Sequence, residues 1–284
     1  QPQMLTVNDE PVFLPIYKDN LIFDLSKDKD KIIQVFELIQ NTFNRNNQNI
    51  ISSNCKDSSK IFSALNGAYL IGKGLGGKIV IFSSSNNLAS NPKMVGGLEK
   101  NATKEQIAYS AHDKKQLGNM GINLTNENMS VDIFASAENQ INTFTLNQLC
   151  EYTNGNLYFY KKFNVELHYK NIFNQIRRVL SRPVCWEGVN RTRFSRGLFI
   201  SNFITPVLIT NVDLFIFPVA DSDQNYTFAG SYKNTSEEEK TENKNVNNYS
   251  SNDNEHFAYI QSALLYSYGD GNRRIRVHNI CIPL

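Results

Sequence analysis

The pattern of this 284-residue chain changes at Pro183. Before Pro183, apolar residues recur at helical spacing in some segments and form short strand-like runs in others. After it, the chain shows strand patterns only. Proline ends a helix because it lacks a backbone N–H and restricts the residue before it. The sequence therefore predicts two domains, residues 1–182 with helices and strands in alternation and residues 183–284 with strands alone.

The first domain is predicted to be α/β, with a mostly parallel sheet flanked by helices, because alternating strands and helices form such sheets. Helices are predicted near residues 32–43, 61–68, 104–117, 145–152 and 165–180. Strands are predicted at residues 78–83, 131–135 and 156–160. Ser26 or Asp28 is expected to cap the first of these helices.

The second domain is predicted to be an antiparallel β-sandwich. Its strands are predicted at residues 188–194, 198–203, 212–219, 257–266 and 274–282. Residues 231–255 are almost wholly polar and low in complexity, so they cannot bury enough surface to offset the entropy of ordering. This segment is expected to be a flexible inserted loop.

The closing segment, residues 261–284, is predicted to form two strands around a tight turn. Alternate side chains of the second strand are basic on one face and mostly apolar on the other, which predicts a half-buried strand. The basic face carries Arg274, Arg276 and His278, and the opposite face carries Ile275, Val277, Asn279 and Cys281.

Charge, apolar runs and cysteine spacing give no indication of several common classes of protein. A formal net charge of +2 does not by itself indicate a nucleic-acid partner. No apolar run approaches the roughly 20 residues of a membrane span. The four cysteines lie far apart, with no Cys-x-x-Cys pair, so neither a zinc site nor disulfides are predicted. Because the chain begins at Gln1 rather than Met, it is expected to be a piece of a longer protein.

Residues 72–77 fit the pattern Gly-x-Gly-x-x-Gly, which leaves a nucleotide-binding α/β enzyme as an alternative. A dinucleotide-binding loop follows a strand and opens a helix, whereas here a helix precedes the glycines and a strand follows them. A helix C-terminus with a turn is therefore favoured. No nucleophile–base or paired-carboxylate signature occurs, so no catalytic residue is predicted and the chain is not expected to be an enzyme.

Arg191 and Arg193 form the best-supported candidate binding site in the sequence. Separated by one residue on a predicted strand, they project from the same face with Cα atoms about 6.5–7 Å apart. An extended peptide with two carboxylates one residue apart has the same spacing, and the guanidinium fork suits carboxylates better than an ammonium does. The alternative is that both are ordinary surface residues.

Several motifs occur in the order found in one known family. They are residues 76–82 (GGKIVIF), 131–134 (VDIF), 155–160 (GNLYFY), 191–193 (RTR), 261–266 (QSALLY) and 273–283 (RRIRVHNICIP). Together they resemble the Sec24 family, the cargo-recognition subunit of the inner COPII coat. The resemblance implies that residues 1–182 are the later part of a von Willebrand A-like trunk domain and that residues 183–284 are most of the β-sandwich.

The resemblance also implies a function. Such a chain is a non-enzymatic coat subunit that binds sorting signals on cargo during vesicle transport from the endoplasmic reticulum to the Golgi. It pairs with the Sec23 subunit through the trunk, is cytoplasmic, and lies peripherally on membranes at exit sites and on COPII vesicles, without nucleic acid. A zinc ion is expected in an upstream module and no cofactor in this chain. The GTPase-activating sister subunit is a further alternative.

A pocket of this family binds Asp-x-Glu and Leu-x-x-Leu-Glu signals on the cytosolic tails of cargo. By resemblance, its paired arginines correspond to Arg191 and Arg193, and its leucine corresponds to Leu264 or Leu265. Thr192 stands where relatives carry an aliphatic residue. That difference is expected to alter the packing behind the arginines but not the direction in which they point.

Overall fold

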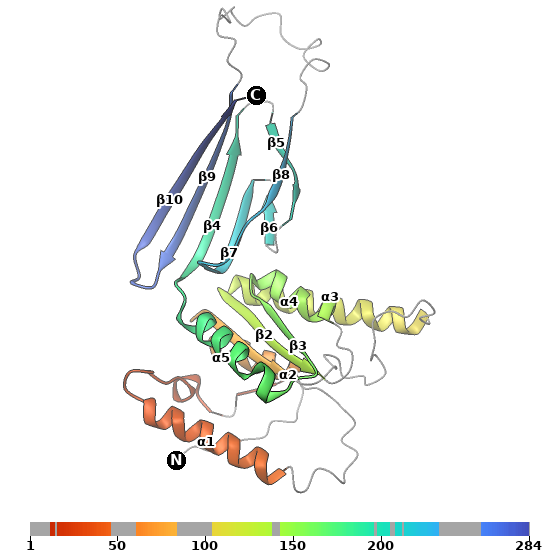
Figure 1. The fold of residues 1–284 in the computed structure, drawn as a ribbon, viewed down its shortest axis with the longest axis vertical. Coiled ribbons are helices and arrows are strands. Elements are labelled where there is room, and N and C mark those ends of the chain that lie inside the picture. The colour runs from red at the N-terminus through yellow and green to blue at the C-terminus, as the bar shows by residue number, and fades with distance from the viewer. Residues whose placement is uncertain are drawn as a thin grey trace, which may run out of the picture.

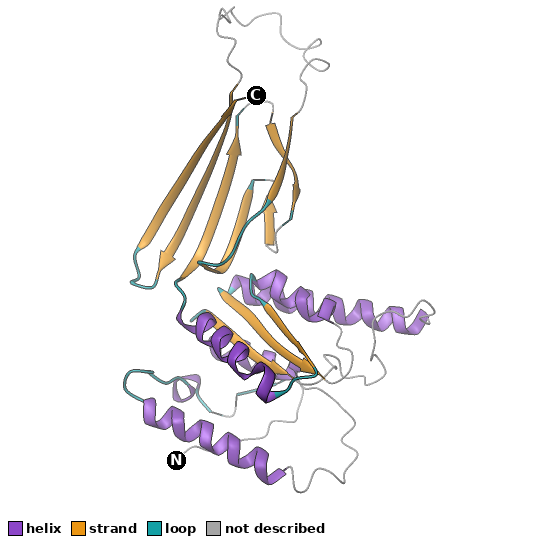
Figure 2. Ribbon diagram, viewed as in Figure 1, coloured by secondary structure: helices purple, strands orange, loops and turns teal. Residues whose placement is uncertain are grey.

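A domain of helices and strands is followed along the chain by an all-strand domain, and Pro183 lies between them (Figure 1 and Figure 2). The structure, a computed structural model, describes residues 12–14, 16–46, 61–83, 104–137, 143–195, 198–204, 208–211, 213–232 and 257–283. Among these residues, no helix is both long enough and apolar enough to cross a membrane.

The first domain has a three-stranded parallel sheet, as predicted. Its described helices are η1 (Lys18–Leu21), α1 (Lys29–Asn46), α2 (Ile61–Gly72), α3 (Lys104–Asn126), α4 (Thr143–Thr153) and α5 (Val165–Ser181). Its strands are β1 (Gly77–Ser83), β2 (Met129–Ala137) and β3 (Leu157–Lys161), paired in the order β1-β2-β3. The predicted elements are all present, and α3 extends to Asn126 rather than ending near residue 117.

Apolar side chains pack on both faces of this sheet, since alternate residues of β2 point to opposite sides. Val131 and Ile133 join a fully buried cluster with side chains of α2, α3 and α4. Phe134 points the other way and packs with Val179 of α5. Helix α5 begins at a true cap, since the Asn164 side chain accepts a hydrogen bond of 2.8 Å from the backbone N–H of Glu166. The sheet is thereby held between two layers of helix.

The glycine-rich segment forms the end of α2 and a turn into β1, as predicted. The backbone N–H groups of Leu75 and Gly76 both donate to the carbonyl of Gly72, at 2.9 and 3.1 Å. Gly74 and Gly76 have φ of +79° and +73°, which favours glycine over any other residue. Because β1 follows the turn, the segment lacks the helix start that a dinucleotide-binding loop requires.

The second domain consists of antiparallel strands in two sheets. Its strands are β4 (Val184–Phe194), β5 (Leu198–Phe203), β6 (Leu208–Asn211), β7 (Leu214–Asp221), β8 (Phe228–Tyr232), β9 (Phe257–Tyr268) and β10 (Arg273–Pro283). One sheet has the order β10-β9-β4-β7-β6 and the other pairs β5 with β8. The short strands β6 and β8 were not predicted. Since β8 includes residues 231 and 232, the predicted loop begins too early, and its part from residue 233 lies outside the described residues.

The two sheets pack face to face around an aromatic core, which confirms the predicted sandwich. Phe215 and Phe217 of β7 are buried against Ile200 of β5, with Phe194 and Phe228 packed at the side of this cluster. Because successive side chains of β7 alternate, Ile216, between these two phenylalanines, points to the opposite face of the larger sheet, called the outer face below.

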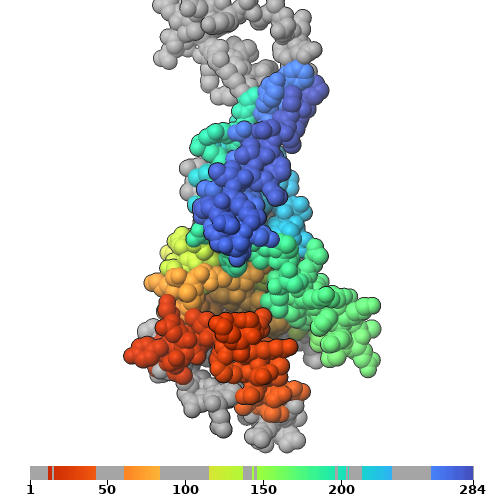
Figure 3. Space-filling view, turned by 90° about the vertical axis from the view of Figure 1, so that its left-hand side faces the viewer, coloured from red at the N-terminus to blue at the C-terminus, as the bar shows by residue number. Residues whose placement is uncertain are grey.

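Strand β10 is exposed at every position, so the prediction of a half-buried strand is wrong. Among the described strands it pairs with β9 alone, at the edge of the larger sheet. The dark blue atoms of the C-terminal segment face the viewer in Figure 3. Ile275 is 70% exposed and Val277 is 48% exposed. Alternation of basic and apolar residues determines which side chains share a face of the strand, but burial of a face requires a neighbouring layer. The described residues form no such layer over β10.

Candidate functional site

Arg191 and Arg193 lie on the outer face of the larger sheet, in its central strand β4. In the antiparallel register, Arg191 is opposite Ala263 and Arg193 is opposite Gln261, both on β9. Both arginine side chains are exposed. The sequence-predicted pair therefore projects side by side from one open face, flanked by the small side chain of Ala263.

The two candidate leucines lie on different faces. Leu265 is opposite Val189 in the same continuous register and shares the outer face with Arg191. Leu264 is opposite Asn190 and packs against the buried aromatic core around Phe217. The structure thus brings Leu265 to the arginine face and separates Leu264 from it, a choice that the sequence alone left open.

Thr192 points away from the arginines into a small buried polar cluster. It is only 1% exposed, and its hydroxyl donates to Asn190 Oδ1 at 3.0 Å. Asn190 Nδ2 in turn donates to Ser262 Oγ at 3.0 Å, which links β4 to β9 on the inner face. The packing behind the arginines is therefore polar, while the arginines themselves still point outward, as expected.

Asp213 belongs to the site and was not identified from the sequence. Arg191 Nε donates to Asp213 Oδ2 at 2.8 Å, with the two side chains 52% and 36% exposed. The hydrogen bond from Arg191 lowers the pKa of Asp213 below its ordinary value, with a smaller contribution from the charge of Arg193. No sequence signal indicates the pair, because it forms only when β7 docks on β4.

Arg193 differs from Arg191 because it has no ion-pair partner among the residues that the structure describes. Its backbone position is fixed in the ladder opposite Gln261, and its side chain is exposed. A guanidinium in this position can bind an incoming carboxylate without first giving up a contact. Among the described residues, one arginine of the site therefore has an ion-pair partner and the other has none.

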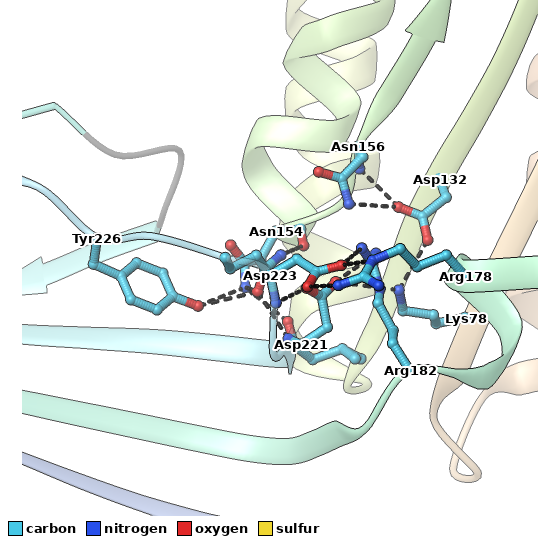
Figure 4. A network of polar contacts seen from close by, with 11 residues as sticks. Lys78, Asp132, Asn154, Asn156, Arg178, Arg182, Asp221, Asp223 and Tyr226 are labelled. Atoms are coloured by element: carbon cyan, nitrogen blue, oxygen red, sulfur yellow. Dashed lines mark hydrogen bonds and ion pairs between the residues drawn. The ribbon is translucent and has the colours of Figure 1, made fainter. Parts of the chain in front are cut away.

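A second group of polar residues joins the two domains (Figure 4). Asp221, at the end of β7, has a side chain only 1% exposed, and Arg182 Nη2 lies 2.5 Å from its Oδ2 without good hydrogen-bond geometry. Lys78 Nζ lies 3.7 Å from the same oxygen and 2.9 Å from Oδ2 of the fully buried Asp132. Each buried carboxylate thus faces a cation, as burial of charge requires.

Asn154 adds a direct contact between the domains. Its Nδ2 donates to the backbone carbonyl of Val219 at 2.7 Å, and its backbone carbonyl accepts from Gln224 Nε2 at 2.6 Å. Asn154 has φ of +57°, a conformation that asparagine tolerates better than most residues. The next residue, Gly155, has no space for a Cβ, which would lie 1.9 Å from the carbonyl oxygen of Val131. These contacts fix the second domain, and with it β4, on the parallel sheet of the first domain.

The described residues place no three His, Cys, Asp or Glu side chains together in a way that could hold a metal ion. The domain-joining network is balanced by lysine and arginine, so its acids have cationic partners already. The expectation that this chain holds no cofactor remains a prediction.

Comparison with known proteins places both domains in one family. The model of the Sec23/Sec24 trunk domain matches residues 1–180, and the model of the Sec23/Sec24 beta-sandwich domain matches residues 185–284. The chain belongs to the Sec23/Sec24 family. The resemblance inferred from the ordered sequence motifs is thereby confirmed.

Relatives of this Sec23/Sec24 chain include Sec24 proteins of distant organisms. Over 288 residues, which is 100% of this chain, it is 26% identical to SEC24 A of Arabidopsis thaliana and spans 25% of that protein. It is 28% identical to SEC24 of Dictyostelium discoideum over 292 residues, again 100% of this chain and 26% of the relative. The chain thus spans about a quarter of the length of these curated relatives.

Its fold is also that of a solved structure, the human COPII-coat protein Sec24c. The match has a TM-score of 0.72 at 20% sequence identity and covers 96% of this chain and 34% of the human chain. At this level of identity the match concerns the fold, which extends across both domains.

Proposed function

We propose that this Sec23/Sec24 chain is part of a COPII coat subunit of the Sec24 kind, a protein that performs no catalysis and binds sorting signals on cargo proteins. The names of its relatives support the proposal, since they are called protein transport proteins and the structural match is called a COPII-coat protein. The trunk would pair with Sec23, and the subunit would act in the cytoplasm, peripherally on endoplasmic-reticulum membranes. No nucleic-acid partner is proposed.

The observation that carries the proposed binding site is the shared outer face of Arg191, Arg193 and Leu265. A cytosolic cargo tail in extended conformation would present two carboxylates one residue apart to the two guanidinium groups. An aliphatic side chain of the same tail would pack on Leu265. Exposed arginine–carboxylate contacts set register and specificity, and the apolar contact adds affinity.

The test is titration of an Asp-x-Glu peptide into the complete protein and into an Arg191→Ala/Arg193→Ala variant. Each charge-assisted contact contributes about 1.5–3 kcal/mol, so the double variant should lose binding by a factor of about 100 or more. Arg276→Ala is the matched control, because Arg276 is an exposed strand arginine that projects from the opposite face of the same sheet. Equal affinity of the wild type and the double variant would contradict the proposed site.

A further inference from the structure

The two arginines of the outer face, Arg191 and Arg193, differ in their ion pairing. Arg191 is paired with Asp213 through its Nε atom at 2.8 Å, whereas Arg193 has no ion-pair partner among the described residues. Arg191, Arg193 and Asp213 together carry a single net positive charge. A ligand with one carboxylate matches that balance, and a second carboxylate on the ligand would approach Asp213 at close range.

Asp213 is held beside Arg191 by the backbone rather than by a chance side-chain contact. Its carbonyl oxygen accepts a hydrogen bond of 3.0 Å from the N–H of Thr192, and the next residue, Leu214, is opposite Arg191 in the β4–β7 ladder. Thr192 is itself fixed by its buried hydrogen bond to Asn190. The backbone of Asp213 therefore stays beside Arg191 whichever rotamer Arg191 adopts.

The contact leaves part of Arg191 free. Asp213 engages the Nε edge, and the described residues provide no hydrogen bond to either terminal nitrogen of that guanidinium. A ligand carboxylate can therefore reach Arg191 end-on while Asp213 stays in place, but it then lies close to a second carboxylate. Like charges at this separation repel, and at an exposed site the effect is modest and sensitive to salt.

We propose that Asp213 is a specificity-determining residue that occupies Arg191 in the free protein and disfavours a second ligand carboxylate, so that the site discriminates weakly between ligands with two acids and ligands with one. This inference rests on the proposed function of the arginine face. In this arrangement Arg193 makes the principal charged contact with the ligand, and Asp213 limits what Arg191 adds to it.

The experiment measures the affinity of the complete protein for four otherwise identical peptides carrying Asp-x-Glu, Asn-x-Glu, Asp-x-Gln or Asn-x-Gln. Asp213→Asn should tighten binding of the Asp-x-Glu peptide by about two- to fivefold and that of each single-acid peptide by less. The gain should shrink as salt increases. Asp270→Asn is the matched control, because Asp270 forms a comparable exposed ion pair with Arg274 away from the site.

The outcomes separate the inference from the proposed function. If Arg193→Gln abolishes binding but Asp213→Asn leaves the two-acid to one-acid ratio unchanged, the inference is overturned and the proposed function stands. If Asp213→Asn weakens binding, Asp213 positions Arg191 for the ligand, and the inference is likewise overturned. If the acidic peptides bind no better than Asn-x-Gln to any of these variants, both the proposed function and the inference are wrong.

Discussion

Leu264 and Leu265 are consecutive residues of β9 whose side chains lie on opposite faces of the larger sheet. Leu265 shares the outer face with Arg191, while Leu264 packs against the aromatic core that contains Phe217. Two residues of the same type therefore have different surroundings, because a strand turns successive side chains to opposite sides.

Truncation of the two leucines should separate stability from binding. Leu264→Ala is expected to lower the free energy of unfolding by about 2 kcal/mol, because it leaves a void beside the buried phenylalanines. Leu265→Ala should cost about 1 kcal/mol or less, since less apolar surface is buried on the outer face, and should weaken peptide binding several-fold. Denaturant unfolding and peptide titration of both variants provide the measurement. A larger loss of peptide affinity in Leu264→Ala would show that the assignment of faces is wrong.

Single neutral substitutions of the arginines should have unequal effects. Arg193→Gln is expected to weaken binding of an Asp-x-Glu peptide by about tenfold or more, because it removes the free guanidinium. Arg191→Gln should have a smaller effect, because the charge of Arg191 is already balanced in part by Asp213. Isothermal titration at low salt distinguishes the two. Equal losses would mean that the ion pair in the free protein has no influence on the ligand.

Replacement of the glycine before β3 should destabilise the trunk. In Gly155→Ala the new Cβ would lie 1.9 Å from the carbonyl oxygen of Val131, and a backbone atom of a central strand cannot move aside. A loss of about 3 kcal/mol is expected in the free energy of unfolding. Gly269→Ala is the control, because no atom lies within 4 Å of its ideal Cβ and its φ is not positive. That variant should be neutral or slightly more stable.

The buried ion pair between the domains should be essential for their association. Asp221→Asn removes the carboxylate that Arg182 and Lys78 share in a nearly dry site and leaves each cation with one other acid, so a cost of about 3 kcal/mol is expected. The expected readout is an unfolding transition at lower denaturant that separates into two steps as the trunk and the sandwich lose their coupling. Asp223→Asn, on the exposed rim of the same network, should have a much smaller effect. A single, unshifted transition for Asp221→Asn would contradict this role.

The rim of the network should also contribute to acid sensitivity. The hydrogen bond from Arg178 lowers the pKa of Asp223 in the folded state below its ordinary value of 3.8. A lowered carboxylate pKa stabilises the fold above that value, and the contribution disappears as pH falls through the folded pKa. The difference in unfolding free energy between wild type and Asp223→Asn should therefore be constant well above pH 3.8 and shrink as the pH falls through the folded-state pKa. A difference that grows on acidification would reverse the sign of this linkage.

Local patterns in the sequence were sufficient to predict the order and type of most elements. Helical periodicity identified the helices around the parallel sheet, and Pro183 marked the change to strands. The reversed order of helix and strand around residues 72–77 correctly predicted a turn, as the positive φ of Gly74 and Gly76 shows. The strands β6 and β8 were missed; they are four and five residues long, and β8 includes residues 231 and 232, where the polar segment assigned to a loop begins.

The sequence by itself determined that Arg191 and Arg193 point the same way, because residues two apart in a strand share a face. Only the tertiary structure decided what else lies on that face. The register of β9 on β4 places Leu265 rather than Leu264 on the face of the two arginines. The pairing of β7 with β4 brings Asp213 beside Arg191. Periodicity is a property of neighbouring residues, whereas register, burial and ion pairing depend on segments brought together from distant parts of the chain. That is also why the alternating pattern of β10 correctly indicated a strand but not that both of its faces lie open.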